Sequence, residues 1–297
     1  MLVFQQSWQK DWWYNMALTL MYITNNPVIA QIAQKAGVDR IWIDMEYIGK
    51  LERQGGMDTV QNHHSIDDIR KLRPIVTSSE LMVRVNPIHD ATIDYVDSKS
   101  EINEAILAGA DVIMLPMFKT VEEVQKFVSF VNGRAKVQLL VETAEAVEII
   151  DDILEVPGID EIHIGLNDLH LFYHMDFMFE LICGDIIKNL CSKMKAKGIK
   201  YGFGGIARVG YGLLPAELII AEHYHLDSTA AILSRGFCDA NLVKDPMEIE
   251  DIFIDGVKNI RLKEKEVAEY TELQYRDNLQ TIREKVASII VAKKQKR

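Results

Sequence analysis

The chain has 297 residues, 48% of them hydrophobic and 26% charged, and its 44 acidic against 33 basic side chains give a net charge of −11. This composition is typical of a globular protein, and its acidity argues against nucleic acid as a partner, because phosphate binding needs a basic face. With three scattered cysteines, no signal-peptide pattern and no apolar run of about 18 residues, the sequence predicts a cytoplasmic protein with reduced thiols and no membrane segment.

Strand-like apolar runs and helix-like segments alternate from residue 17 onward. A strand at 17–24 is followed by a helix with Asn26 as its cap, Pro27 in its first turn and Gly37 at its end. Further strands are expected at 40–46, 80–87, 111–117, 136–143, 159–168, 199–207 and 228–238. Further helices are expected at 65–73, 100–110, 120–133, 144–156, 176–197 and 215–223.

The fold class follows from this alternation. Strands with mostly unbroken apolar runs are typical of a parallel sheet that is covered on both faces. Eight such units predict an α/β protein with a (β/α)8 TIM barrel, and an open doubly wound sheet is the alternative. We expect an N-terminal segment at 1–19, the barrel at 20–245 and a C-terminal helical extension at 246–297. The extension is either a pair of solvated helices or an arm that packs on a neighbouring subunit.

Polar side chains and three glycines stand where the expected strands end, which is where a TIM barrel builds its active site. These residues are Asp44, Glu46, Arg84, Asn86, Glu142, Thr143, Gly165, Asn167, Asp168, Gly204, Gly205, Ser234 and Arg235. Four of them are carboxylates, which repel one another when crowded, and a divalent cation would offset this repulsion. Oxygen ligands without cysteine or paired histidine favour Mg²⁺ or Mn²⁺. For Asp44 or Asp168 taken singly, a cap of the next helix is the alternative.

The ordered motifs "DME" after the second strand, "VRVNP", "MLPMFKTVEEV", "VET" and "IGLNDL" resemble the HpcH/HpaI aldolase and citrate lyase family over roughly residues 20–240. This resemblance implies a metal-dependent barrel that handles pyruvate. It implies that Glu142 and Asp168 hold the metal and that Arg84 contacts the keto oxygen of pyruvate or its enolate. It also implies that backbone amides near Gly165 and Asn167 receive the substrate carboxylate. Asp44 and Glu46 would organise the surrounding waters.

The sequence departs from the family pattern at two positions and in one longer stretch. Tyr47 stands where the family often has a histidine for acid/base work, and Leu140 replaces a polar residue. The stretch "GKLERQGGMDTVQNHH" brings in Lys50, His63 and His64. An unperturbed histidine titrates near pH ~6.5, so we expect His64, or His63, to act as the base that Tyr47 cannot be. The alternative is that both histidines are surface residues and a metal-bound hydroxide positioned by Glu46 acts alone.

Two glycines and an arginine stand near the carboxyl ends of the last two expected strands. Gly204, Gly205 and Arg235 could hold a distal anionic group of the substrate, or the glycines could serve only a tight turn. No lysine directly ends an expected strand, which disfavours a Schiff-base mechanism.

The sequence therefore predicts a class II, divalent metal-dependent aldolase that cleaves or forms a carbon–carbon bond of a 2-oxo acid through a pyruvate-type enolate. A homo-oligomer, trimeric or hexameric, is expected. The alternatives are a citrate lyase-like enzyme that acts on a CoA thioester and a catalytically inactive barrel that only binds a ligand.

Overall fold

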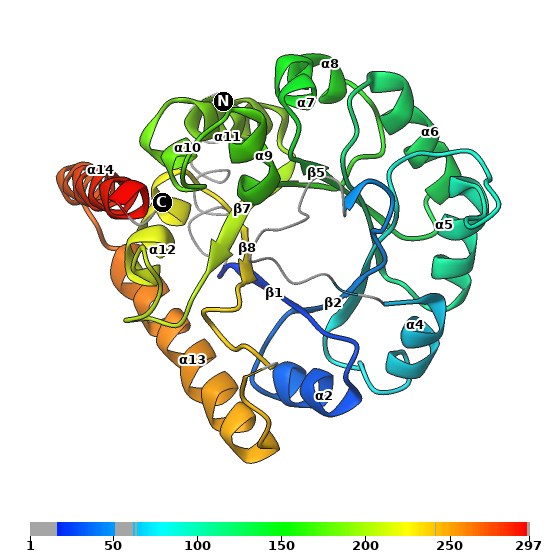
Figure 1. The fold of residues 1–297 in the computed structure, drawn as a ribbon, viewed down its shortest axis with the longest axis horizontal. Coiled ribbons are helices and arrows are strands. Elements are labelled where there is room, and N and C mark those ends of the chain that lie inside the picture. Colours follow the sequence, from blue (N-terminus) through cyan, green and yellow to red (C-terminus); the bar gives the residue numbers. More distant parts are fainter. Residues whose placement is uncertain (1–16, 51–61, 63, 241, 296–297) are drawn as a thin grey trace, which may run out of the picture.

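The computed structural model describes residues 17–50, 62, 64–240 and 242–295, which form a closed barrel of parallel strands in the order β1 to β8 (Figure 1). The strands are β1 (Thr19–Ile23), β2 (Arg40–Asp44), β3 (Glu80–Arg84), β4 (Val112–Leu115), β5 (Lys136–Val141), β6 (Glu161–Ile164), β7 (Lys200–Ile206) and β8 (Ala230–Leu233). Each strand pairs with the next along the chain, and β8 closes the ring by pairing with β1, with Thr19 opposite Ala230. The expected TIM barrel is confirmed, and the open doubly wound sheet is wrong.

Helices surround the barrel on its outside (Figure 1). They are α2 (Pro27–Lys35), α4 (Ile66–Leu72), α5 (Ser98–Leu107), α6 (Val121–Val131), α7 (Ala144–Glu148), α8 (Ile150–Ile153), α9 (Leu166–Phe172), α10 (Glu180–Cys183), α11 (Ile186–Lys197), α12 (Ala216–His225), α13 (Pro246–Val267) and α14 (Glu272–Gln295). The Asn26 side chain caps α2 by accepting the Val28 N–H at 2.9 Å, as expected. The single helix expected at 144–156 is wrong, because Ile149 leaves the helical conformation (φ −99°, ψ 16°) and separates α7 from α8.

The interior of the barrel is layered, because alternate residues of each strand face inward. On β2, Ile41 and Ile43 pack outward against the helices, whereas Trp42 belongs to an inner cluster. This cluster contains Met21, Trp42, Met82, Val112, Met114, Leu140 and Ala230. Below it, Arg40 donates two hydrogen bonds to Glu161 at 2.5 and 2.7 Å and closes the amino-terminal end of the barrel. The apolar layer therefore separates a charged floor from the mouth at the carboxyl ends of the strands.

The C-terminal extension consists of α13 and α14, which run along the side of the barrel next to α12 (Figure 1). Glu264 of α13 accepts the N–H of Leu18, immediately before β1, at 2.6 Å. Arg261 donates to the Leu18 carbonyl at 2.7 Å. The extension thus packs on the barrel of its own chain. Among the described helices, none has the length and apolarity that crossing a membrane requires.

Candidate active site

Asp44, the last residue of β2, is the centre of a buried charged cluster at the mouth. Arg84, opposite it at the end of β3, donates from Nε to Oδ1 and from Nη2 to Oδ2 of Asp44, both at 2.8 Å. Lys50 Nζ donates to Oδ2 at 2.6 Å, and Asn62 Nδ2 lies 3.1 Å from the same oxygen. The N–H of Glu46 contacts Oδ1 at 3.3 Å. The carboxylate of Asp44 therefore accepts from several donors at once.

These partners determine the charge of Asp44. Burial alone would raise the pKa of its carboxyl group, but the charges and hydrogen bonds of Arg84 and Lys50 outweigh burial and hold the pKa well below its usual range. Asp44 is consequently an anion at all ordinary pH values and a poor proton acceptor. Its place in the cluster is to position Arg84 and Lys50.

Arg84 connects this cluster to the next strands of the barrel. Its Nη1 lies 3.2 Å from Oε2 of Glu46, and its guanidinium lies 5.1 Å from the ring centroid of Trp42. Burial would lower the pKa of Arg84, but the charges of Asp44, Glu46 and Glu142 raise it. A buried arginine in an apolar strand needs an anionic partner or a ligand, and Asp44 is that partner. A direct contact of Arg84 with substrate stays a prediction.

Lys50, which the sequence analysis named in the stretch after the second strand without assigning it a role, belongs to the charged cluster. The side chain lies buried in the mouth between Asp44 and Glu46, with Nζ 3.8 Å from the Glu46 carboxylate. None of the described strands ends in a lysine, but the turn after β2 folds Lys50 back over the mouth. Its spacing of four residues from Glu46 was the only signal in the sequence. Since Arg84 and Lys50 face the carboxylates, the protein itself offsets part of the repulsion that was assigned to a metal.

The turn after β2 is held in place by Asn86, which follows β3. Asn86 Oδ1 accepts the N–H groups of Tyr47 and Ile48 at 2.8 and 2.9 Å. The Asn86 amide in turn donates to the buried carboxylate of Glu101 at 2.8 Å, whose pKa is raised by burial. The Tyr47 hydroxyl donates to the backbone carbonyl of His64. The substitution of tyrosine for histidine at position 47 thus gives the turn an anchor to His64.

His64 lies buried at the mouth, and His63 lies outside the described residues. The backbone N–H of Asp44 donates to Nδ1 of His64 at 3.0 Å. Because Nδ1 accepts this hydrogen bond, the neutral imidazole carries its proton on Nε2. Nε2 is therefore a hydrogen-bond donor in this arrangement, and the expected base role would require loss of the bond to Asp44. The catalytic role of His64 stays a prediction.

Glu142 and Asp168 come from neighbouring strand ends. Glu142 follows β5, and Asp168 lies in the first turn of α9, directly after β6. Both carboxylates are buried. The Met117 N–H donates to Glu142 Oε1 at 3.1 Å, with Met117 in the left-handed region (φ 56°) that a non-glycine residue rarely adopts. A Cβ on Gly165 would lie 2.8 Å from Glu142 Cβ and 2.9 Å from Oε2, so glycine is needed for Glu142 to lie against β6.

These two carboxylates suit a hard divalent cation. Among the described residues, no group of three or more His, Cys, Asp or Glu side chains is arranged as a metal site. Glu142 and Asp168 would therefore have to hold the ion as the two carboxylate ligands that the protein supplies. Mg²⁺ is commonly bound by one or two carboxylates, with water and substrate completing its shell. The close approach of Glu142 that Gly165 permits fits this donor set.

The expected carboxylate receptor at Gly165 needs a correction. The Gly165 N–H donates to the Val141 carbonyl at 2.9 Å, because the sheet ladder continues through this residue, and it is therefore not free for substrate. Asn167 lies in the first turn of α9, where backbone N–H groups have no partner within the helix. The role of Asn167 in binding the substrate carboxylate stays a prediction.

Gly204 lies in β7, and Arg235 follows the neighbouring strand β8. Gly204 has φ of 53°, and a Cβ there would meet Leu166 Cδ1 at 2.6 Å, so backbone conformation and packing account for this glycine. Arg235 is exposed and lines a cavity of about 400 Å³ at the ends of β1 and β8. The same cavity is lined by Asn62 and His64, which connects it to the charged cluster. Whether either residue binds a distal anion stays a prediction.

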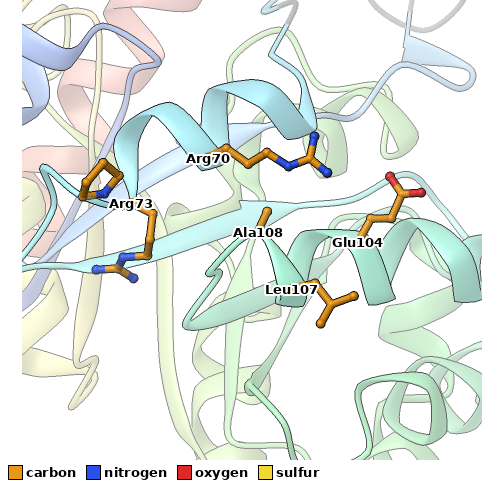
Figure 2. A pocket seen from close by; sticks show the side chains of 6 residues that line it. Arg70, Arg73, Glu104, Leu107 and Ala108 are labelled. Atoms are coloured by element: carbon orange, nitrogen blue, oxygen red, sulfur yellow. The ribbon is translucent and has the colours of Figure 1, made fainter.

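A second hollow of about 360 Å³ lies on the outside of the barrel between α4 and α5 (Figure 2). Two arginines line it, and both are already paired: Arg70 with Asp67 at 2.7 Å and Arg73 with Asp111 at 2.6 Å. Asp111 also accepts the N–H of Leu81 near the start of β3. The hollow therefore lies toward the amino-terminal side of the barrel, away from the mouth, where residues serve stability.

Comparisons with known proteins agree with this geometry. Solved structures with the same fold include an HpcH/HpaI aldolase from Desulfitobacterium hafniense DCB-2 (16% identity, TM-score 0.57, covering 82% of this chain and 93% of that one). They also include an HpcH/HpaI aldolase/citrate lyase family protein from Burkholderia cenocepacia J2315 (15%, 0.59, 79% and 95%) and the citrate synthase SbnG (19%, 0.55, 76% and 90%). No curated protein matches the chain in sequence. Residues 18–177, more than half of the chain, match the model of one family, and the chain therefore belongs to the HpcH/HpaI aldolase/citrate lyase family.

Proposed function

We propose that this protein is a divalent metal-dependent carbon–carbon lyase that cleaves or forms an aldol bond of a 2-oxo acid through a pyruvate-type enolate. The observation that carries the proposal is the placement of Glu142 and Asp168, two buried carboxylates on neighbouring strand ends, with the cationic Arg84 close enough to Glu142 for their charges to interact. Family membership agrees with a lyase. The identity of the metal, Mg²⁺ or Mn²⁺, and of the substrate belongs to the proposal.

The residues of the mouth have separate tasks in this reaction. A bound ion would act as a Lewis acid on the 2-oxo group. Arg84, fixed by two hydrogen bonds to Asp44, presents a delocalised cation where negative charge develops on the substrate oxygen. His64 Nδ1 accepts the Asp44 N–H at 3.0 Å, which holds the imidazole at the rim of the mouth. The apolar layer around Trp42 lies between the mouth and the charged floor and would keep water from reaching the enolate from below.

The test follows exchange of the pyruvate methyl protons with D₂O by NMR, with Mg²⁺ or Mn²⁺ present. Wild-type protein should catalyse this exchange, whereas Glu142→Gln and Asp168→Asn should lose it and should bind the ion at least ~10-fold more weakly by calorimetry. Glu145→Gln is the matched control, because Glu145 lies three residues further on and pairs with Lys119 at the surface.

Two results would contradict the proposal. Unchanged ion affinity in both site variants would remove the metal assignment. Wild-type protein that binds pyruvate without exchanging its protons would favour the inactive ligand-binding barrel. The expected trimer or hexamer and the cytoplasmic location remain predictions that light scattering and cell fractionation test.

A further inference from the structure

The side chain of Lys50 is buried at the mouth with donors to spare. An ammonium group carries three N–H donors. Among the described residues, its Nζ has one hydrogen-bond acceptor, Oδ2 of Asp44 at 2.6 Å. The nearest oxygen of Glu46 lies 3.8 Å away, beyond hydrogen-bonding distance. A buried charge normally satisfies its hydrogen bonds within the protein, so the remaining donors of Lys50 indicate a ligand.

Asp44 has no need of Lys50 for its own compensation. Arg84 already binds both oxygens of Asp44 at 2.8 Å, and Asn62 and the Glu46 N–H add further donors. A second cation at the same carboxylate must still lose its water and its side-chain freedom, which opposes folding. The stability of the fold therefore does not account for the presence of Lys50.

The backbone also directs Lys50 into the mouth. Asn86 fixes the turn through the N–H groups of Tyr47 and Ile48, and the Lys50 N–H closes the turn on the Tyr47 carbonyl at 3.1 Å. The side chain thus starts from an anchored position and ends on Asp44. Such preorganisation is typical of a group that must meet a ligand in one orientation.

We infer that Lys50 is a substrate-binding residue whose ammonium, held by Asp44, donates its remaining hydrogen bonds to an anionic oxygen of the 2-oxo acid. The inference rests on the proposed function and adds a second substrate-facing cation beside Arg84. The ion pair with Asp44 directs Nζ of Lys50 to a carboxylate, in the geometry of a hydrogen-bond donor. Lys50 therefore acts as a hydrogen-bond donor and forms no Schiff base.

The experiment compares Lys50→Met and Lys50→Arg with wild-type protein in calorimetric titrations of pyruvate at saturating Mg²⁺. We expect at least 10-fold weaker pyruvate binding for Lys50→Met and partial recovery for Lys50→Arg, which keeps the charge. The melting temperature of Lys50→Met should equal or exceed that of wild type, because Asp44 keeps Arg84. Lys193→Met is the control, since Lys193 makes a surface pair with Asp151 at 2.7 Å.

Each other outcome decides against a specific statement. Equal pyruvate affinity in wild type and Lys50→Met, or a lowered melting temperature with unchanged affinity, would overturn the role of Lys50 alone. Borohydride reduction in the presence of pyruvate that adds mass to Lys50 would overturn the hydrogen-bonding role in favour of a Schiff base. Wild-type protein that binds no pyruvate would overturn the proposed function and this inference with it.

Discussion

Replacement of Asp44 by asparagine tests whether this residue is the anchor of the charged cluster. The change keeps the shape of the side chain and opens no cavity, but it removes the negative charge between two buried cations. Arg84 would lose its bidentate partner, and Lys50 would lose its only hydrogen-bond acceptor among the described residues. The new amide N–H group would also face donors.

The size of the effect follows from burial. Removing one partner of a buried ion pair typically costs about 3 to 5 kcal/mol, because the other charge stays desolvated. Asp44 has no exposed surface and serves two cations, so we expect a loss of roughly 4 kcal/mol in the free energy of unfolding. For a chain of this length such a loss corresponds to a fall of roughly 10 °C in the melting temperature.

Urea unfolding of wild type and Asp44→Asn measures this difference. Asp67→Asn is the control. Asp67 pairs with Arg70 at 2.7 Å, but both side chains are exposed, so this variant should lose no more than about 0.5 kcal/mol in the free energy of unfolding. The double variant Asp44→Asn/Arg84→Met should lose clearly less than the sum of the two single losses. If Asp44→Asn loses less than about 1 kcal/mol, the cluster is not held together by this carboxylate.

Two further changes test other parts of the barrel. Gly165→Ala should displace Glu142, because the added Cβ would lie 2.8 Å from Glu142 Cβ. We expect the free energy of unfolding to fall by about 1 to 3 kcal/mol and divalent-ion binding, measured by calorimetry, to weaken ~10-fold. Gly184→Ala is the control and should change neither quantity, because a Cβ there would have nothing within 4 Å. Burial lowers the pKa of His163 from 6.5 to about 4. Between these pH values the histidine is protonated in the unfolded chain but neutral in the folded chain. The free energy of unfolding that is present above pH ~6.5 is therefore lost as the pH falls toward 4. Between pH 7 and pH 5 this histidine should lower the free energy of unfolding of the wild type by about 2 kcal/mol. In urea unfolding, His163→Asn should therefore lose correspondingly less stability between these two pH values than the wild type. An equal loss in both proteins would exclude His163 as the cause.

The fold could be predicted from the sequence because its signals are local. Unbroken apolar runs indicated buried parallel strands, and residues such as Asn26 marked where helices begin. The meeting of Asp44, Arg84 and Glu142 at one mouth followed, since the carboxyl ends of parallel strands share one edge. The division of the helix at Ile149 had no such signal, because a single residue leaves the helical conformation without a glycine or proline.

The pairing within the mouth could not be predicted for a physical reason. Lys50 is buried because Asn86, far along the chain, holds the turn that carries it. The proton position on His64 depends on the backbone N–H of Asp44, which no residue pattern encodes. The sequence shows which charged residues stand at the strand ends. Which of these charges form ion pairs depends on hydrogen bonds between residues that are far apart in the sequence.

Closure of the ring has a consequence for how the chain is synthesised. Thr19 of β1 pairs with Ala230 of β8, which leaves the ribosome about 210 residues later. At bacterial or eukaryotic translation rates this interval is roughly 10 to 40 seconds, during which the outer edge of β1 has no partner strand. The hydrogen bonds of the Leu18 backbone with Glu264 and Arg261 of α13 can form only later, because α13 is synthesised after β8. An open strand edge is a template for association with other chains, so chaperone binding to nascent chains should be strongest before β8 and α13 emerge.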